Sequence, residues 1–314
     1  MGPSEFSKRF ERMARNPSSS APRPGELFIA EPWGLPPQGS SAEACSARDV
    51  VVENGLIVSC SLSGRAFISS ARDLFRENPI RSLRLVAVAP FLKELANCER
   101  LAGLTRLDLD GNQIGPEGLK VLLASPFLAN LRELGLGRNG LGPAGVESLI
   151  AWPGRATTRR LELQANGLSA DDGERLFGCS EWPELSGLNL SQNALGPEFA
   201  ECLTRLALTE LEIEAVELGS AGATRLAKSG WKPLALNLGF NRLADSGVDG
   251  LLRSDFLSRC GKLDLRGNLI RIAEPFFDSS KLENLRWLDL RANPLDETTA
   301  ENLRRRFGPR VLLA

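Results

Sequence analysis

Carboxylate side chains that recur at regular intervals are the residues of this chain best suited to chemistry. They stand beside leucines at two positions of a repeated pattern, and the set comprises Asp108, Asp110, Glu162, Glu212, Glu214, Asp264 and Asp289. Closely spaced carboxylates can act as a general acid and base, or they can bind a basic group of another molecule. The other residue types in the chain bear on which chemistry applies.

Histidine is absent from all 314 residues, which removes the commonest general base at neutral pH and any Ser-His or Cys-His nucleophile pair. The six cysteines lie far apart, at positions 45, 60, 98, 179, 202 and 260, with no CxxC pair for zinc or redox work. The adjacent Asp171 and Asp172 are more typical of a helix N-terminus than of a metal site. We therefore predict no enzyme, no metal and no cofactor, and free thiols with Cys60, Cys202 and Cys260 in the core.

The overall charge does not favour a polyanionic partner. The 38 basic and 39 acidic residues give a formal charge of −1, so no global field attracts nucleic acid or an anionic membrane. No window of about 18 apolar residues suggests a membrane span, and the first residues lack the apolar core of a secretory signal. We expect a cytoplasmic monomer that binds neither nucleic acid nor membrane.

A repeat positions the carboxylates. The pattern LTRLDLDGNQI at 104–114 recurs as LRELGLGRNGL at 131–141, LSGLNLSQNAL at 185–195 and LRWLDLRANPL at 285–295. The pattern asparagines stand at positions 112, 139, 166, 193, 241, 268 and 293. The long step from 193 to 241 hides one further copy at 208–218, in which Val216 replaces the asparagine.

Each part of the repeat has a physical role. In Leu107-Asp108-Leu109 the alternation predicts a short strand with both leucines inward and the aspartate outward. The asparagine amide can satisfy backbone groups in the turn that follows. Beyond the turn, Leu119, Leu122 and Leu123 have the spacing of a helix with one apolar face. One coil is therefore strand, turn, helix and return, and stacked coils bury each other's apolar faces.

These repeats resemble the leucine-rich repeat family, and specifically its ribonuclease-inhibitor-like branch, because helices follow the turns. The resemblance implies an α/β fold, a curved horseshoe solenoid with a parallel sheet on the concave face and helices on the convex face. It covers residues 56–314, with about eleven coils including caps. One coil, IRIAEPFFDSSKLENL, contains Pro275, so we expect an extended or short 3₁₀ segment there.

Residues 1–55 differ in composition from the repeats. Their Pro, Ser and Gly content predicts an N-terminal cap or a partly disordered arm. This segment also weakly resembles the repeat-companion domain of some bacterial proteins. The matching residues are Asn16-Pro17, Ala21-Pro22-Arg23 and the pair Ala30 and Trp33.

Known leucine-rich repeat proteins bind proteins through the inner face, and the resemblance implies the same here. The predicted partner-binding residues are Asp108, Asp110, Glu162, Glu212, Glu214, Asp264, Arg266, Trp287, Asp289 and Arg291. Their carboxylates would form an acidic stripe that points to solvent, ends in a basic patch and faces a basic partner surface. The alternative is a solvated surface that only keeps the sheet soluble. Trp287 is either an exposed anchor or a side chain folded onto Lys262.

Three functions follow from these patterns, and the leading one is a protein-binding scaffold. An alternative is an enzyme regulator, such as a GTPase-activating protein or an enzyme inhibitor of the ribonuclease-inhibitor-like type. A catalyst is the third, but it would depend on a carboxylate pair in an open arc that implies no deep pocket.

Overall fold

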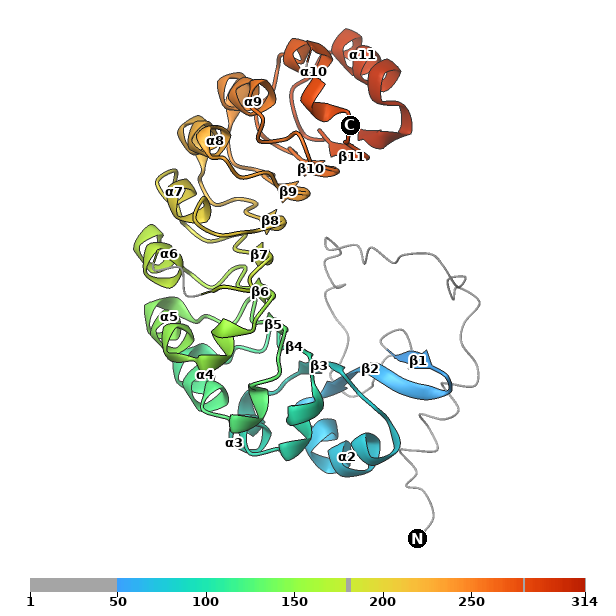
Figure 1. Ribbon diagram of the computed structural model, residues 1–314, viewed down its shortest axis with the longest axis vertical. Helices are drawn as coiled ribbons and strands as arrows, with labels where there is room; N and C mark the ends of the chain where they lie inside the picture. The colour runs from blue at the N-terminus through green and yellow to red at the C-terminus, as the bar shows by residue number, and fades with distance from the viewer. Residues whose placement is uncertain (1–49, 179–181, 279, 314) are drawn as a thin grey trace.

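The computed structural model describes residues 50–178, 182–278 and 280–313. These residues form a curved solenoid with strands along the inner side of the arc and helices along the outer side (Figure 1). The predicted arm, residues 1–55, lies almost entirely outside the described residues, as do the positions that resemble the repeat-companion domain. The predicted α/β horseshoe is confirmed.

Twelve strands form one sheet in chain order. They are β1 Val51–Glu53, β2 Leu56–Ser63, β3 Ser82–Val86, β4 Arg106–Asp108, β5 Glu133–Gly135, β6 Arg160–Glu162, β7 Gly187–Asn189, β8 Glu210–Glu212, β9 Ala235–Asn237, β10 Lys262–Asp264, β11 Trp287–Asp289 and β12 Val311–Leu312. Each strand from β3 onward pairs in parallel with the strand before it. The strand leucines are in register, so Leu107 is paired with Leu134 and Leu134 with Leu161.

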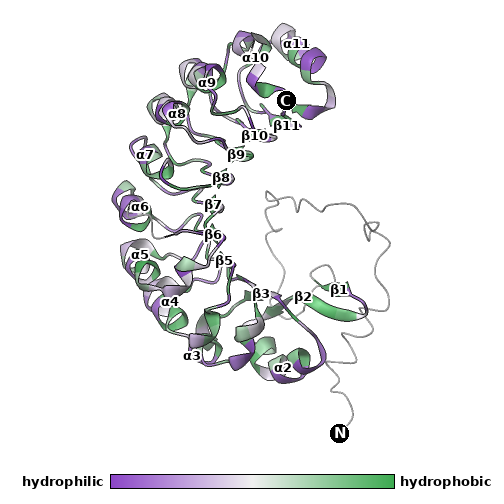
Figure 2. Cartoon of the chain, viewed as in Figure 1, coloured by the Kyte–Doolittle hydropathy of each residue, from purple (hydrophilic) through white to green (hydrophobic). Residues whose placement is uncertain are grey.

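The first strand pair departs from the parallel pattern that the repeats predict. Strand β1 runs antiparallel to β2, with Val52 opposite Ile57. A two-residue turn, Asn54-Gly55, joins them with both residues in the left-handed region, which fits a tight hairpin. The hairpin is strongly apolar (Figure 2), and Val51 and Leu56 are exposed.

Helices cover the convex side, one after nearly every strand. The α-helices are α2 Gly64–Glu77, α3 Leu92–Ala96, α4 Gly115–Leu123, α5 Gly142–Ala151, α6 Ala170–Phe177, α7 Ala200–Leu203, α8 Gly219–Lys228, α9 Ala244–Arg253, α10 Glu274–Asp278 and α11 Glu297–Phe307. The 3₁₀ segments are η2 Ala89–Phe91, η3 Glu99–Gly103, η4 Pro126–Leu128, η5 Pro153–Ala156, η6 Ser280–Leu282 and η7 Gly308–Arg310. The apolar faces of the α-helices and 3₁₀ segments pack on the strand leucines to form one continuous core.

Local sequence explains where several helices begin. Pro116 and Pro143 lie in the first turns of α4 and α5, where proline has no hydrogen bond to lose. At α6, the Ser169 hydroxyl accepts from the Asp172 N–H, and the Asp172 carboxylate accepts from the Ser169 N–H. Asp172 therefore caps a helix, as its position beside Asp171 predicts.

The coil around Pro275 corrects one prediction. Residues Glu274–Asp278 form the short α-helix α10, followed by η6, in place of the extended or 3₁₀ segment that Pro275 favours. The physical reason is that Pro275 is the second residue of α10, where its fixed φ suits a helix start.

A ladder of buried asparagines ties consecutive turns together. The Asn139 side chain accepts from the N–H groups of Asn112 and Ile114 at 3.1 and 3.2 Å, and donates to the carbonyls of Leu109 and Gly137, both at 2.9 Å. Four bonds from one buried amide satisfy backbone groups that no strand or helix pairs. The asparagine turns therefore hold neighbouring coils at a fixed spacing.

The ladder is interrupted at Val216. Within the described residues, the Asn193 N–H has no acceptor from the following coil, whereas the corresponding N–H of Asn166 donates to Asn193 Oδ1 at 3.0 Å. Ala215 and Glu217 nevertheless adopt positive φ, as residues beside the ladder asparagines do. The Val216 turn thus keeps the shape of an asparagine turn without its hydrogen bonds.

Candidate partner-binding face

The concave face carries the predicted rows of polar side chains in the predicted register. Strand pairing places Asp108 beside Gly135, Gly135 beside Glu162, and so on along the arc. The remaining members of that row are Arg84, beside Asp108 at the N-terminal end, and Asn189, Glu212, Asn237, Asp264 and Asp289. A second row lies two residues after the first, just beyond the end of each strand from β4 to β11. The sequence therefore places every predicted site residue on one surface.

Most carboxylates on this face are less exposed than a free acidic stripe requires. Glu212, Asp264 and Asp289 have exposed fractions of only 7%, 1% and 0%. The expectation that these side chains point freely into solvent is wrong. The physical reason is that basic and amide side chains from adjacent strands lie over them and supply hydrogen bonds that replace water.

Glu212 shows how this burial works. Its carboxylate accepts from the Asn189 amide at 2.8 Å and lies 4.0 Å from the Arg160 guanidinium. Arg160 in turn pairs with Glu210 on the same strand as Glu212. Burial, reinforced by the nearby Glu162 charge, raises the Glu212 pKa to about 8, although Arg160 opposes the shift. Glu212 is therefore largely protonated at neutral pH.

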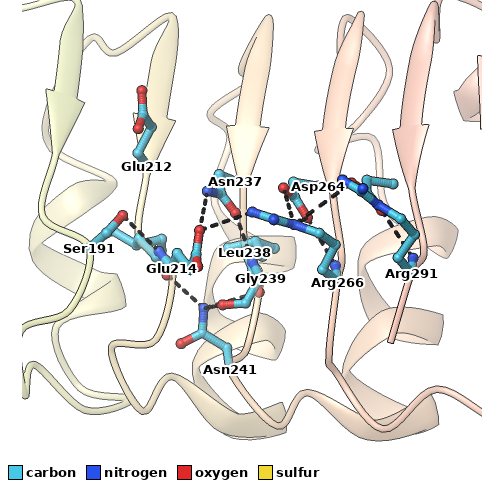
Figure 3. Close-up of polar contacts among 12 residues, drawn as sticks. Ser191, Glu212, Glu214, Asn237, Leu238, Gly239, Asn241, Asp264, Arg266 and Arg291 are labelled. Carbon is cyan, nitrogen blue, oxygen red and sulfur yellow. Dashed lines mark hydrogen bonds and ion pairs between the residues drawn. The ribbon is translucent and has the colours of Figure 1, made fainter. Parts of the chain in front are cut away.

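A second network spans β8 to β11 and centres on Arg266 (Figure 3). Its guanidinium donates to Asp264 at 2.8 Å and reaches back across two strands to Glu214 at 3.1 Å. Glu214 also accepts from the Asn237 amide at 3.1 Å. Arg266 thus pairs with both an aspartate and a glutamate of the predicted stripe.

Asp289 and Arg291 form the C-terminal end of the face. The Arg291 Nε donates to Asp289 Oδ1 at 3.0 Å, and the Arg291 backbone N–H donates to the same oxygen at 3.0 Å. Arg266 Nε also lies 3.7 Å from Asp289. The predicted basic patch is present, but its arginines are engaged by the aspartates beneath them.

The coil of β5 forms a gap in the two rows because Gly135, at the end of β5, and Gly137, two residues beyond it, have no side chains. Asp108 lies over Gly135, while Asp110 and Gln164 lie over Gly137, where a side chain would collide with them. Asp110 is paired with Arg138 at 2.5 Å through one oxygen. Its other oxygen, Oδ1, is buried without a hydrogen-bond partner among the described residues, as is Gln164 Oε1.

Glu162, beside this gap, is the least compensated carboxylate. No basic group of the described residues lies within ion-pair distance of its side chain. Burial raises the Glu162 pKa, with Arg106 opposing and Asp108 adding to the shift. The β4–β6 part of the face therefore contains carboxylate and amide oxygens without partners among the described residues, namely those of the Glu162 carboxylate, Asp110 Oδ1 and Gln164 Oε1. The carboxylates of the β8–β11 part have arginine or asparagine partners.

Trp287 occupies the position that the sequence left open between two alternatives. Strand pairing puts it beside Lys262, and the Lys262 ammonium lies 5.0 Å from the ring centroid. This is a cation–π contact within the protein, so the ring is partly covered by its neighbour. Trp287 remains half-buried rather than fully exposed.

Several residues of these networks are not among the predicted partner-binding residues. Asn189 and Asn237 share the outward row with the carboxylates, and Arg138 reaches the face from a turn. The detectable signal was the strand register, which places each amide next to a glutamate. The long Arg138 side chain gave no such signal because its turn position does not fix its direction.

The cysteines agree with their predicted places. Cys60, Cys202 and Cys260 are buried and Cys98 is partly exposed, all as free thiols. Cys45 and Cys179 lie outside the described residues.

Within the described residues, no three His, Cys, Asp or Glu side chains converge as metal ligands. None of the described helices is both long and apolar enough to cross a membrane.

Comparison with known proteins agrees with the repeat geometry. Two segments, residues 104–123 and 128–149, match the family model described as Leucine Rich repeat. The fold is a leucine-rich repeat solenoid. A search of curated protein sequences gave no match. Among solved structures, this solenoid is similar to the chain in the "Crystal structure of Rad7 and Elc1 complex in yeast", with a TM-score of 0.56 and 17% identity over 81% of this chain and 73% of that one. Because identity is low, the likeness concerns the fold alone.

Proposed function

We propose that this leucine-rich repeat chain is a protein-binding scaffold that docks a partner on its concave face. The observation that carries the proposal is the network of side chains held across adjacent strands, such as Arg266 with Asp264 and Glu214. Side chains that are already fixed lose little conformational entropy when a partner binds. A surface that only keeps the sheet soluble does not require side chains fixed by hydrogen bonds between strands.

The charges suggest where a basic partner group would sit. Around Arg266 and Arg291 each of the carboxylates Glu214, Asp264 and Asp289 already has an arginine partner, so that part of the face is less available to a basic group of the partner. At β4–β6, Glu162 has no ion pair among the described residues, and Asp110 Oδ1 has no donor. We propose that a lysine or arginine of the partner pairs with Glu162, which is only partly buried.

The similar yeast structure supports the proposal only by showing that a chain of comparable fold occurs in a protein complex. Its title describes a complex of Rad7 with Elc1, so a chain with a comparable fold was crystallised in a protein assembly. The same docking chemistry would serve a scaffold or an enzyme regulator, and the partner's own activity distinguishes the two. Acceleration of GTP hydrolysis by a captured GTPase, for example, would identify a regulator.

The test compares charge reversals after affinity capture of a partner from the native cell. The Glu162→Lys variant should weaken binding by about 1–3 kcal/mol, and wild-type binding should weaken as salt approaches about 0.5 M. Glu117→Lys and Glu174→Lys, both exposed on convex helices, are matched controls. Binding that is lost with the convex reversals and kept with Glu162→Lys would move the function to the helical side.

A further inference from the structure

The turn edge of the solenoid, where β9 and β10 end, carries large apolar side chains in solvent. Phe240 follows β9 and Leu269 follows β10, with exposed fractions of 46% and 54%, and Ile272 is 51% exposed. In the part of the chain that the structure describes, the other exposed large apolar residues are Val51, Val52, Leu56, Ile68 and Leu234, which belong to other coils or precede β9. This edge is therefore a local concentration of exposed apolar surface.

Phe240 and Leu269 also have an unusual backbone conformation for large apolar residues. Phe240 has φ 55° and Leu269 has φ 62°, both in the left-handed region. At the flanking positions of earlier turns, residues with positive φ are glycine or carry polar or small side chains, namely Gly111, Gln113, Arg138, Gly140, Ala165, Gly167, Gln192, Ala215 and Glu217. A bulky apolar residue there adds backbone strain to the cost of exposure. Folding gives no reason for both costs in adjacent coils.

The Phe240 ring is held in place from below. It lies over Gly267 of the next coil, where any Cβ would collide with the ring. The Arg266 guanidinium lies 5.8 Å from the ring centroid. The ring is thus fixed by its neighbours while nearly half of its surface stays open, which favours its use as a contact point.

A basic residue lies close in sequence to each of the two apolar side chains, although Phe240 precedes its turn asparagine and Leu269 follows its own. Arg242 follows Phe240 by two residues and Arg271 follows Leu269 by two, and both arginines are exposed. Within the described ranges, neither arginine has an ion pair with a carboxylate. Asp245, which lies between these two arginines in sequence, accepts instead from the backbone N–H groups of Arg271 and Ile272 at 2.7 and 2.9 Å.

We infer that Phe240, Leu269, Ile272, Arg242 and Arg271, here called the turn-edge patch, dock an acidic peptide segment of a partner protein. An apolar side chain of that segment packs between Phe240 and Leu269, and its carboxylates pair with Arg242 and Arg271. The exposed Glu217 and Glu274 lie before and after the patch in sequence and limit the acidic segment to a few residues. The inference rests on the proposed protein-binding function but assigns it a second surface.

The test is selection of a phage-displayed library of random peptides on the immobilised full-length chain. Enriched peptides should be acidic with one large apolar residue. The Phe240→Asn and Leu269→Asn double variant should lower their binding at least tenfold. Because asparagine tolerates left-handed φ, this variant should fold with unchanged or higher thermal stability. The Arg242→Glu and Arg271→Glu double variant should also abolish binding of the acidic peptides.

Matched controls keep the outcome decisive. Leu234 is 43% exposed before β9, away from the patch, so Leu234→Asn removes similar apolar surface there. Arg259→Glu changes an exposed arginine between α9 and β10. Neither control should change peptide binding by more than about twofold.

Three results overturn the inference: no enrichment, enrichment of basic peptides, or acidic peptides whose binding survives the asparagine double variant. Peptides released by Glu162→Lys but not by that double variant would support the concave-face proposal while refuting this one. Peptides released only by the turn-edge variants would support this inference and leave the concave-face proposal to its own charge-reversal test. The two proposals therefore fail independently.

Discussion

The Asn189 amide donates a hydrogen bond of 2.8 Å to the Glu212 carboxylate on the neighbouring strand. This one contact joins β7 to β8 on the concave face and covers a glutamate that the sequence places in solvent. It places a group with a pKa of about 8 at the centre of the proposed binding face. The consequences for stability can be measured directly.

The first prediction concerns pH. The folded-state pKa of Glu212 is raised from 4.5 to about 8, so between these values the folded chain holds a proton that the unfolded chain has lost. The contribution of Glu212 to stability therefore falls as pH rises from about 4.5 to 8. Glu212→Gln removes this titration. Urea unfolding at several pH values should show the variant gaining stability relative to wild type as pH rises. Parallel curves would show that Glu212 ionises normally.

A charge reversal at the same position should damage the fold. Lysine at position 212 would place a buried positive charge close to Arg160 and leave the Asn189 amide without its acceptor. We expect Glu212→Lys to lower the free energy of unfolding by about 3 kcal/mol or more. The matched control is Glu117→Lys on the convex surface, with an expected change within about 0.5 kcal/mol. Equal stability of the two variants would mean that Glu212 is not buried in solution.

The asparagine ladder gives a prediction about the core. Asn139→Ala removes four hydrogen bonds from a buried site and leaves the Asn112 and Ile114 N–H groups without acceptors. We expect a loss of about 3 kcal/mol or more in denaturant unfolding. The exposed Asn97, whose amide only caps α3, is the control, and Asn97→Ala should cost under about 1 kcal/mol.

The ladder and the leucine frame could be predicted from sequence because both follow from a fixed period. The register of Leu107 with Leu134, and with it the row containing Glu212, needed only the repeat length. The burial of Glu212 could not be predicted, because it depends on where the Asn189 and Arg160 side chains turn after leaving their strands. Side-chain direction on an open sheet is set by neighbours rather than by period.

The same distinction explains the other departures. In the sequence, Pro275 predicts a break in the helix. The effect of a proline depends on its position, and Pro275 stands in the first turn of α10, where proline is tolerated. Trp287 had two open alternatives because the sequence shows that Lys262 is its neighbour but not whether the ammonium lies over the ring. The turn-edge patch could not be predicted because Phe240 stands at a position of the repeat that the leucine and asparagine pattern does not constrain.

The cysteines allow a test of the core by labelling. Burial raises the Cys260 pKa to about 12, so this thiol is both hidden and protonated at neutral pH. In a variant that keeps only Cys98 and Cys260, a thiol reagent at pH 7.5 should modify the partly exposed Cys98 first. Cys260 should react only at the rate of unfolding. Mass spectrometry of peptides would identify each site, and equal rates would contradict the burial of Cys260.

The last prediction is that the interrupted ladder can be repaired. Val216 is fully buried, and its neighbours Ala215 and Glu217 already have the left-handed φ values found beside ladder asparagines. Val216→Asn should let the new side chain accept from the Asn193 N–H and donate to the Leu190 carbonyl. Each recovered bond contributes about 1 kcal/mol, against about 1.5 kcal/mol lost with the apolar side chain. With three bonds of the kind made by Asn139 regained, the net expectation is a gain of about 1.5 kcal/mol. Val216→Thr, which adds a hydroxyl of similar volume but cannot bridge the coils, should destabilise. Destabilisation by both variants would show that this coil has adapted its packing to valine, because the amide would then find no room to reach either partner.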